Sequence, residues 1–399
     1  MALELPVYLD HHATTPLDPR VLDAMLPYYG PHFGNSASST HRYGWTAEAA
    51  VEDARERLAA AIGAREPREI VFTSGTTESD NLALQGVMRA NRERGNHLVT
   101  SAIEHPAVLD TARALEAEGF ATTELPVDAD GLVDPDAVAA ALGEATQLVS
   151  IMAANSEIGV LQPIAEIGRV CRERGVAFHS DAAQAVGKVR VDVEEQGVDL
   201  LSFCAHKLYG PKGIGALYVR EGRPRLRLAP LLHGGGHERG LRSGTLPVAL
   251  IVGFARAVEL CLEDLEAEAA RLAGLRDRLF GRLQELGEVR GNGHPSRRLP
   301  GNLNVSFAGV EADALLVALK DLALSSGSAC ASATGEPSHV LLALGLSEEL
   351  ARGALRFGLG RGTSEEQVER AAARVCEEVR AQRAHGPSAW GARRPDARP

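Results

Sequence analysis

The order of apolar and polar positions along the chain predicts an α/β fold from about residue 46 to residue 220. Amphipathic helical stretches alternate there with short apolar runs that are typical of buried strands. The predicted strands are 70–73, 97–101, 148–152, 176–180 and 198–203, and the predicted helices include 47–62, 107–118 and 164–174. This βαβ order favours a mostly parallel sheet with helices on both faces.

A smaller α+β unit is predicted beyond the glycine-rich stretch 233–240. A long helical pattern over 247–286 indicates a connecting helix, and strands are predicted at 303–307 and 354–359. We expect four parts in total. They are an N-terminal segment (1–20) that packs with the small domain, a large cofactor-binding domain (21–255), a small domain (256–383) and a disordered tail (384–399) rich in Pro, Gly, Ala and Arg.

Four polar residues directly follow predicted strands: Thr77, His105, Asp181 and Lys207. Ligands of open parallel sheets bind beyond the carboxyl ends of the strands. The shared placement therefore predicts that these side chains form one site.

Lys207 is the most informative residue of this group. It lies in Ser-Phe-Cys-Ala-His-Lys-Leu-Tyr-Gly-Pro-Lys-Gly, residues 202–213, where a strand pattern ends in a turn. A partly desolvated lysine beside another cation can lose its proton near neutral pH, as a Schiff-base lysine must. A solvated surface lysine is the alternative, which the flanking residues and the motifs described below disfavour.

The segment Ser74-Gly75-Thr76-Thr77-Glu78 lies between a strand and a helix, where backbone N–H groups and Thr hydroxyls can hold a phosphate. Plain helix capping is the alternative. Asp181 could pair with a protonated pyridine nitrogen, or it could cap a helix. His105 could stack on a flat ring or move protons, or it could be a loop residue with one hydrogen bond.

Two residues of the C-terminal part also suggest chemistry. Cys330 lies in Ser-Ser-Gly-Ser-Ala-Cys-Ala-Ser, residues 325–332, which has no hydrophobic period. A thiol in such a stretch is typical of an accessible nucleophile rather than of a core residue. Arg356 is a cation inside an apolar strand, which predicts an anionic partner; a structural ion pair is the alternative to a substrate carboxylate.

Composition narrows the class of protein. The net charge of −11 argues against nucleic acid or an anionic membrane as a direct partner. No apolar run approaches the ~18 residues of a membrane span, and the N-terminus lacks the pattern of a secretory signal. Five cysteines without a Cys-x-x-Cys pair suggest neither a disulfide framework nor a metal site, and favour a cytoplasmic location.

Together these stretches resemble the cysteine desulfurases of the IscS/NifS kind. The motifs are Phe-Thr-Ser-Gly (72–75), Thr-Glu-Ser-Asp-Asn (77–81), His-Lys (206–207), Tyr-Gly-Pro-Lys-Gly (209–213), Arg-Ser-Gly-Thr (242–245) and Ser-Ser-Gly-Ser-Ala-Cys (325–330). The last motif is similar to that of the subgroup with a long catalytic loop. The resemblance implies the PLP-dependent transferase fold of the aspartate aminotransferase type, in its class-V branch.

The resemblance also implies a role for each matching residue. Pyridoxal 5′-phosphate (PLP) would be bound to Lys207, with His105 stacked on its ring, Asp181 at the pyridine nitrogen and Gln184 at the phenolic oxygen. Thr76, Thr77, Cys204 and His206 would surround the phosphate, and Thr245 would reach in from the partner subunit of a homodimer. Asn155 and Arg356 would hold the substrate carboxylate.

The chain departs from the family pattern at two of its positions. Cys204 stands where a serine is usual, and Ser156 follows Asn155 where a second asparagine is usual. Since a thiol is a poorer hydrogen-bond donor than a hydroxyl, we expect weaker retention of the cofactor.

The predicted reaction converts L-cysteine to L-alanine. Lys207 would remove the Cα proton, and the Cys330 thiolate would attack the substrate sulfur and keep it as a persulfide. An iron–sulfur scaffold or a tRNA-thiolation protein would accept this sulfur. A selenocysteine lyase is the rival enzyme, disfavoured by the residues around Cys330, and a non-catalytic scaffold is disfavoured by the intact set of Lys207, Asp181, His105 and Cys330.

Overall fold

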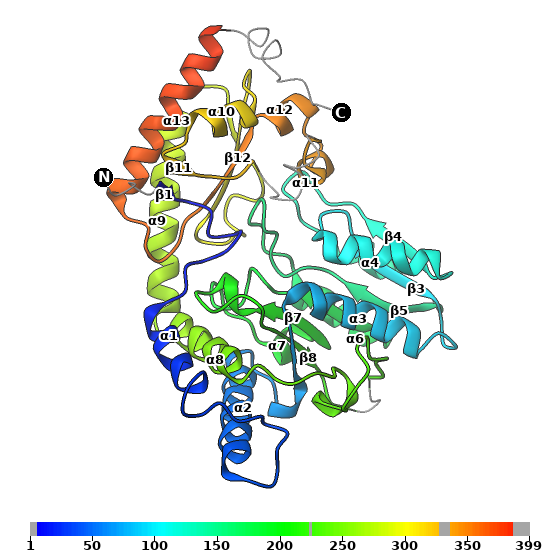
Figure 1. Cartoon of the computed structure of the whole chain (residues 1–399). Helices are drawn as coiled ribbons and strands as arrows, with labels where there is room; N and C mark the ends of the chain where they lie inside the picture. Colours follow the sequence, from blue (N-terminus) through cyan, green and yellow to red (C-terminus); the bar gives the residue numbers. More distant parts are fainter. Residues whose placement is uncertain (1–5, 223–225, 327–335, 386–399) are drawn as a thin grey trace, which may run out of the picture.

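The computed structural model describes residues 6–222, 226–326 and 336–385 (Figure 1). Its centre is a seven-stranded sheet in the order β2-β8-β7-β6-β5-β3-β4. The strands are β2 (Ile70–Thr73), β3 (His97–Ser101), β4 (Ala121–Leu125), β5 (Thr146–Ser150), β6 (Ala177–Asp181), β7 (Leu200–Cys204) and β8 (Gly215–Val219). Only β8 runs antiparallel to its neighbours, β2 and β7. The predicted α/β fold with a mostly parallel sheet is thus confirmed.

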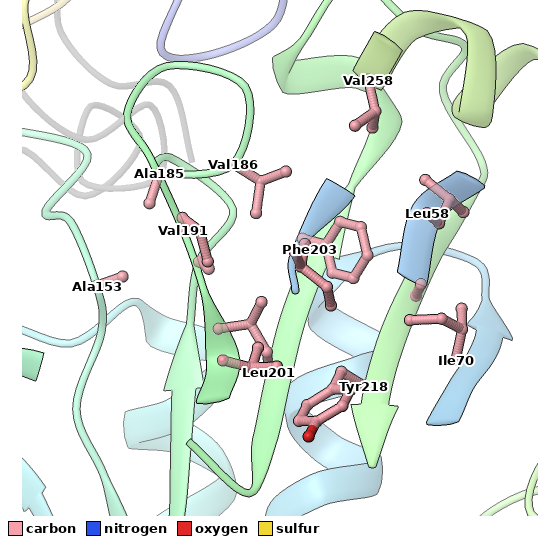
Figure 2. Close-up of a cluster of buried hydrophobic side chains, with 14 of the residues drawn as sticks. Leu58, Ile70, Ala153, Ala185, Val186, Val191, Leu201, Phe203, Tyr218 and Val258 are labelled. Atoms are coloured by element: carbon pink, nitrogen blue, oxygen red, sulfur yellow. The ribbon is translucent and has the colours of Figure 1, made fainter. Parts of the chain in front are cut away.

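Alternate residues of the central strands enter two different cores, as the period of a strand requires. Ile70, Phe203 and Tyr218 lie in the larger core, which includes residues of α1 (Pro19–Met25), α2 (Arg42–Ala61), α6 (Ile164–Arg174) and α8 (Val248–Leu262). Figure 2 shows Leu58 and Val258 beside these strand residues. Leu200 and Leu217 enter the other core, with α3 (Thr76–Ala90) and α4 (Pro106–Ala117). Helices therefore cover both faces of the sheet.

A smaller unit has its own core and a three-stranded antiparallel sheet in the order β12-β10-β9. The strands are β9 (Val289–Gly291), β10 (Asn302–Phe307) and β12 (Ala354–Gly358), packed with α9 (Leu265–Gln284) and α13 (Glu365–His385). The N-terminal strand β1 (Val7–Tyr8) pairs in parallel with β11 (Leu322–Ala323) of this unit. Val7 and Leu9 are buried in its core.

The remaining elements are short. They are η1 (Leu26–Tyr28), η2 (Pro67–Glu69), α5 (Pro135–Ala141), α7 (Val193–Gln196), η3 (Ala205–Lys207), η4 (Glu238–Gly240), α10 (Ala312–Ala318), α11 (His339–Ala343) and α12 (Glu348–Arg352). Within the described ranges, no helix is both long and apolar enough to cross a membrane.

The helical pattern over 247–286 forms two helices, α8 and α9, rather than the single connecting helix expected from the sequence. The break falls at Glu263 and Asp264. The two helices belong to different cores: α8 is buried against the large unit, and α9 contributes Leu275, Leu279 and Leu283 to the small one. Helical periodicity continues across the break, so the pattern alone could not reveal it.

A buried ion pair secures the edge strand β2, which leads directly to Gly75. The two terminal nitrogens of Arg55, Nη1 and Nη2, donate to Glu238 at 2.8 and 2.9 Å, and Nη1 also donates to the Ile70 carbonyl at 2.7 Å. The Phe72 N–H donates to Glu238 at 2.8 Å. The pair therefore satisfies backbone groups at the free edge of the strand.

We expect Arg55→Ala to lower the free energy of unfolding by about 3 to 5 kcal/mol, because it leaves the Glu238 carboxylate buried and unpaired. Arg57→Ala is the matched control, since Arg57 lies on the same helix but forms its ion pairs with the more exposed Asp53 and Glu259. Arg57→Ala should lower the free energy of unfolding by about 0 to 1 kcal/mol. Urea unfolding followed by circular dichroism measures both; equal losses would contradict the structural role of Arg55.

Candidate active site

A cavity of about 540 Å³ opens at the carboxyl ends of the parallel strands and brings together most of the predicted site residues. Those that line it are Thr76, Thr77, His105, Asn155, Asp181, Gln184, Cys204, His206, Lys207 and Arg356. Thr245 is exposed and does not line it. Cys330 lies outside the described residues. The cavity is also lined by His12, from the N-terminal segment, and by His339 and Arg356 of the smaller unit.

Lys207 closes the short helix η3 immediately after β7. Its Nζ donates hydrogen bonds to the carbonyl oxygens of His12 at 2.6 Å and Ala13 at 2.7 Å. Burial lowers the pKa of this amine, and the Arg356 cation lowers it further, whereas the Asp181 carboxylate acts in the opposite direction. The amine is thus both fixed in place and easier to deprotonate than an exposed lysine.

Asp181 ends β6, and its Oδ1 accepts a hydrogen bond from the Ala183 N–H at 2.8 Å. Burial raises the pKa of this carboxyl group, while His105 and Lys207 lower it. A cationic ring nitrogen in the cavity would favour its ionised form in the same way.

His105 caps α4, where its Nδ1 accepts from the Ala107 N–H at 3.1 Å. Burial lowers the pKa of the imidazole, against the opposing effect of Asp181. The capping bond leaves Nε2 as the proton-bearing nitrogen of the neutral ring. The histidine therefore combines the capping role with a place in the cavity wall.

The N-terminus of α3 forms one end of the cavity. Gly75 precedes the helix and provides no side-chain cap, and a Cβ atom there would have no heavy atom within 4 Å. The Thr76 hydroxyl is buried without a hydrogen bond of normal geometry. The N–H groups and the buried Thr76 hydroxyl at the start of this fifteen-residue helix suit a phosphate group.

Two further residues lie at this end. Burial raises the pKa of the Cys204 thiol, so it remains a neutral, weak donor. His206 lies 3.2 Å from the Thr14 hydroxyl through its Nδ1. Burial, together with the Lys207 and Lys212 cations, lowers the pKa of His206 to about 4, so its ring is neutral at neutral pH.

Arg356 projects from β12 with only 3% of its side chain exposed. Its Nη2 donates to Asp10 Oδ1 at 2.7 Å and its Nη1 to the Ser156 carbonyl at 3.1 Å, while its buried Nε has no partner. Asp10 is thus the anionic partner that the sequence predicted for this cation. The free N–H still allows a bond to a substrate carboxylate.

Asn155 is buried, and its amide is already engaged within the protein. Its Nδ2 donates to the Ile103 carbonyl at 2.9 Å, and its Oδ1 accepts from the N–H groups of Glu157 and Ile158 at 2.8 and 3.0 Å. The side chain therefore holds a turn beside the cavity. Its contact with a substrate carboxylate stays a prediction, and it would require these bonds to rearrange.

Several ionisable residues at or beside the site were missed by sequence reasoning: the buried His12, Glu104 and Glu157, and the half-buried Lys188. Lys188 follows Gln184 by four residues and donates to its Oε1 at 2.6 Å, a spacing that could have indicated the contact. The other three have no periodic signal, because tertiary packing alone places them at the cavity. Burial raises the pKa of Glu157 to about 7.

These features match the requirements of PLP. A buried amine, a carboxylate at a neighbouring strand end, an imidazole in the wall and a helix N-terminus are the groups that bind its aldehyde, ring and phosphate. The unpartnered atoms Thr76 Oγ1 and Arg356 Nε show that the cavity retains polar capacity for a ligand. The fold and the site thus define a PLP-dependent enzyme of the aminotransferase type.

Comparisons with known proteins agree. The family Aminotransferase class-V matches residues 7–371. A relative described as cysteine desulfurase IscS, from Anaeromyxobacter dehalogenans, is 56% identical over 96% of this chain and 95% of its own length. The cysteine desulfurase of Mus musculus is 54% identical over 96% of this chain and 83% of its own length.

Solved structures give the same result. A NifS-like protein superposes with a TM-score of 0.88 at 38% identity, covering 94% of this chain and all (100%) of that one. A structure described as SspA in complex with cysteine has a TM-score of 0.78 at 40% identity, covering 88% of this chain and 98% of that one. The chain belongs to the class-V aminotransferase family and, within it, to the PLP-dependent cysteine desulfurases.

Glu104 provides a test of the electrostatics of the site. Its Oε1 accepts from the Ser101 hydroxyl at 2.6 Å and the Met152 N–H at 2.9 Å, but its Oε2 is buried without a partner. Burial raises the pKa of this carboxyl group from 4.5 to about 8. The folded protein therefore binds a proton that the unfolded chain releases as the pH rises above 4.5.

We expect the contribution of Glu104 to stability to fall as the pH rises from about 5 to about 8, because at this carboxyl group the unfolded state binds fewer protons than the folded state in that window. In Glu104→Gln the decline should be shallower, since the amide retains the Oε1 acceptor but cannot ionise. Thermal unfolding across this window measures the stability of both proteins. Subtracting one pH profile from the other removes the contributions that both share, such as that of Lys188. Parallel curves would show that Glu104 does not titrate there.

Proposed function

We propose that this cysteine desulfurase converts L-cysteine to L-alanine at the cavity and places the sulfur on Cys330. The observation that carries the proposal is the half-buried Lys207 amine, held by two carbonyl groups in the same cavity as Asp181 and Arg356. When bound, PLP supplies an aldehyde that reacts with amines and a ring that stabilises negative charge at the substrate Cα.

The residues of the chain supply binding and proton transfer. The lowered pKa of Lys207 allows its amine to bind PLP and then to take the Cα proton as a general base. Asp181 would hold a proton at the pyridine nitrogen, and Arg356 would bind the substrate carboxylate through its free N–H. His105 would stack on the ring and assist proton transfer at the substrate.

The described residues on both sides of Cys330 support its role as nucleophile. Ser325 pairs with Arg356, whose N–H donates to the Ser325 carbonyl at 2.7 Å. His339 and Val340, on the other side, line the cavity. Described residues on either side of the segment that carries the thiol therefore contact Arg356 or line the cavity. In the proposed step the Cys330 thiolate attacks the cysteine sulfur, the Cβ–S bond breaks, and L-alanine and a Cys330 persulfide result.

We further propose that the protein acts as a cytoplasmic homodimer in which Thr245 contacts the phosphate of the partner subunit's cofactor. Thr245 is exposed in the single chain. Large aromatic side chains are also exposed near the start of α2, including Phe33 at 67% and Trp45 at 54%, which favours a protein contact there. An iron–sulfur scaffold or a tRNA-thiolation protein would accept the persulfide sulfur.

We expect Lys207→Ala and Cys330→Ala each to reduce alanine and sulfide release from L-cysteine by at least about 100-fold, because each removes a reacting group. Cys330→Ala should still bind PLP through Lys207. Assays contain PLP and a thiol reductant, and Lys320→Ala and Cys376→Ala serve as controls outside the site. Normal persulfide formation in Cys330→Ala would refute the assigned nucleophile.

We expect Cys204→Ser to lose PLP about 3- to 10-fold more slowly on dialysis than the unchanged protein. A hydroxyl at the phosphate end is a better donor than the buried thiol, and one such hydrogen bond contributes about 0.5 to 1.5 kcal/mol. Cofactor content is measured by absorbance after alkaline release. Unchanged retention would mean that residue 204 does not contact the phosphate.

A further inference from the structure

His12 occupies the centre of a hydrogen-bond network that sequence reasoning did not predict. Its carbonyl accepts from Lys207 Nζ at 2.6 Å and from Gln184 Nε2 at 2.9 Å. Its ring nitrogen Nδ1 lies 3.0 Å from Gln184 Oε1. The side chain is 2% exposed and lines both the main cavity and a second cavity of about 160 Å³ behind Lys207.

The network fixes the orientation of the Gln184 amide. Lys188 Nζ donates to the Gln184 oxygen at 2.6 Å. Gln184 Nε2 in turn faces the His12 carbonyl, which can only accept. Both neighbours therefore require the same assignment of oxygen and nitrogen in this amide.

This orientation in turn fixes the tautomer of His12. Because Gln184 presents an oxygen to Nδ1, Nδ1 must carry the proton and donate. Nε2 then bears a lone pair, and it is buried without a hydrogen-bond partner. Burial holds the pKa of His12 well below its ordinary value, and the Lys188, Arg356 and Lys207 cations act in the same direction. His12, which lines the main cavity, thus carries a neutral ring with a buried acceptor.

An unpaired buried acceptor is costly unless a ligand satisfies it. His12 needs only its Nδ1–H to hold Gln184 in place. This structural role therefore does not account for the buried acceptor at Nε2. Arg356 lines the same cavity as His12 and can only donate. An α-amino acid carries a carboxylate, which suits Arg356, and an amino group whose N–H needs an acceptor.

We propose that His12 is a further substrate-binding residue, whose Nε2 accepts a hydrogen bond from the amino group of the incoming amino acid while Arg356 binds its carboxylate. This inference rests on the proposed function. An acceptor at the N–H would orient the nitrogen lone pair for reaction with the cofactor at Lys207.

The test uses holoenzyme and three forms of residue 12. His12→Asn keeps a donor near the position of Nδ1 for Gln184 but removes the acceptor at Nε2. His12→Gln extends an amide, which contains an acceptor, toward the position of Nε2. The probe is L-alanine, whose binding is followed by titration of the visible absorbance of the bound cofactor. PLP content, thermal unfolding, and kcat and KM for L-cysteine are measured alongside.

We expect the Kd for L-alanine and the KM for L-cysteine to rise about 10-fold in His12→Asn, as the loss of one hydrogen bond to a buried polar group predicts. PLP content and unfolding temperature should stay unchanged, and His12→Gln should recover part of the loss. Unchanged Kd and KM in His12→Asn would overturn the proposal. The proposal would also be overturned if both variants lost PLP and thermal stability to the same extent. That result would show that His12 has a structural role only.

Measurements on the wild-type enzyme distinguish failure of the His12 proposal from failure of the proposed function. If the wild-type protein binds PLP and releases alanine from L-cysteine, a negative result with the variants contradicts only the proposed role of His12. An unchanged protein that does neither would overturn the proposed function and this inference with it.

Discussion

The placement of a lysine amine inside the protein is the constraint on which the rest of the site depends. Removing an amine from water is costly unless acceptors replace the water. The carbonyl groups of His12 and Ala13 do so for Lys207, and both come from the N-terminal segment rather than from the sheet. That segment runs from the small unit, where the Leu9 carbonyl accepts from the Gly358 N–H, to the large unit, where the Thr15 N–H donates to the His206 carbonyl. The contact between the two units and the reactivity of the lysine therefore have the same structural origin.

The cavity contains more buried ionisable groups than it can pair internally. Lys207 and Arg356 line it together with Asp181, Glu104 and Glu157, and several polar atoms of this group have no partner in the described part of the chain. Such groups destabilise an empty site and stabilise a filled one, because a ligand replaces their missing hydrogen bonds. The same burial shifts the pKa values of acids upward and of amines downward, which brings several groups close to neutral pH. Binding and proton transfer thus depend on one property of the site, its exclusion of water.

Much of the site was predictable because it follows from local patterns. Asp181 and Lys207 each come at the end of an apolar strand, and parallel strands bring their carboxyl ends to one edge of a sheet. Helix α3 begins after a Gly that follows a strand, which is visible in the sequence as a candidate phosphate site. The internal partner of Arg356 was predicted as an anion but not as Asp10, because the two residues are 346 positions apart. The break between α8 and α9 was missed, since both helices share one period and differ only in the core that buries them.

The sequence by itself determined the fold class, the family and the identity of the lysine, the aspartate and the histidine at the strand ends, because these depend on short-range patterns and on motifs. Tertiary structure alone decided which groups surround them. His12 reaches Gln184 and Lys207 only because β1 pairs with β11 and directs the N-terminal segment across the large unit. The burial of Glu104 and Glu157 also depends on the contact of separate elements. No local pattern encodes such contacts, since their free energy arises only when the folded chain has removed these side chains from water.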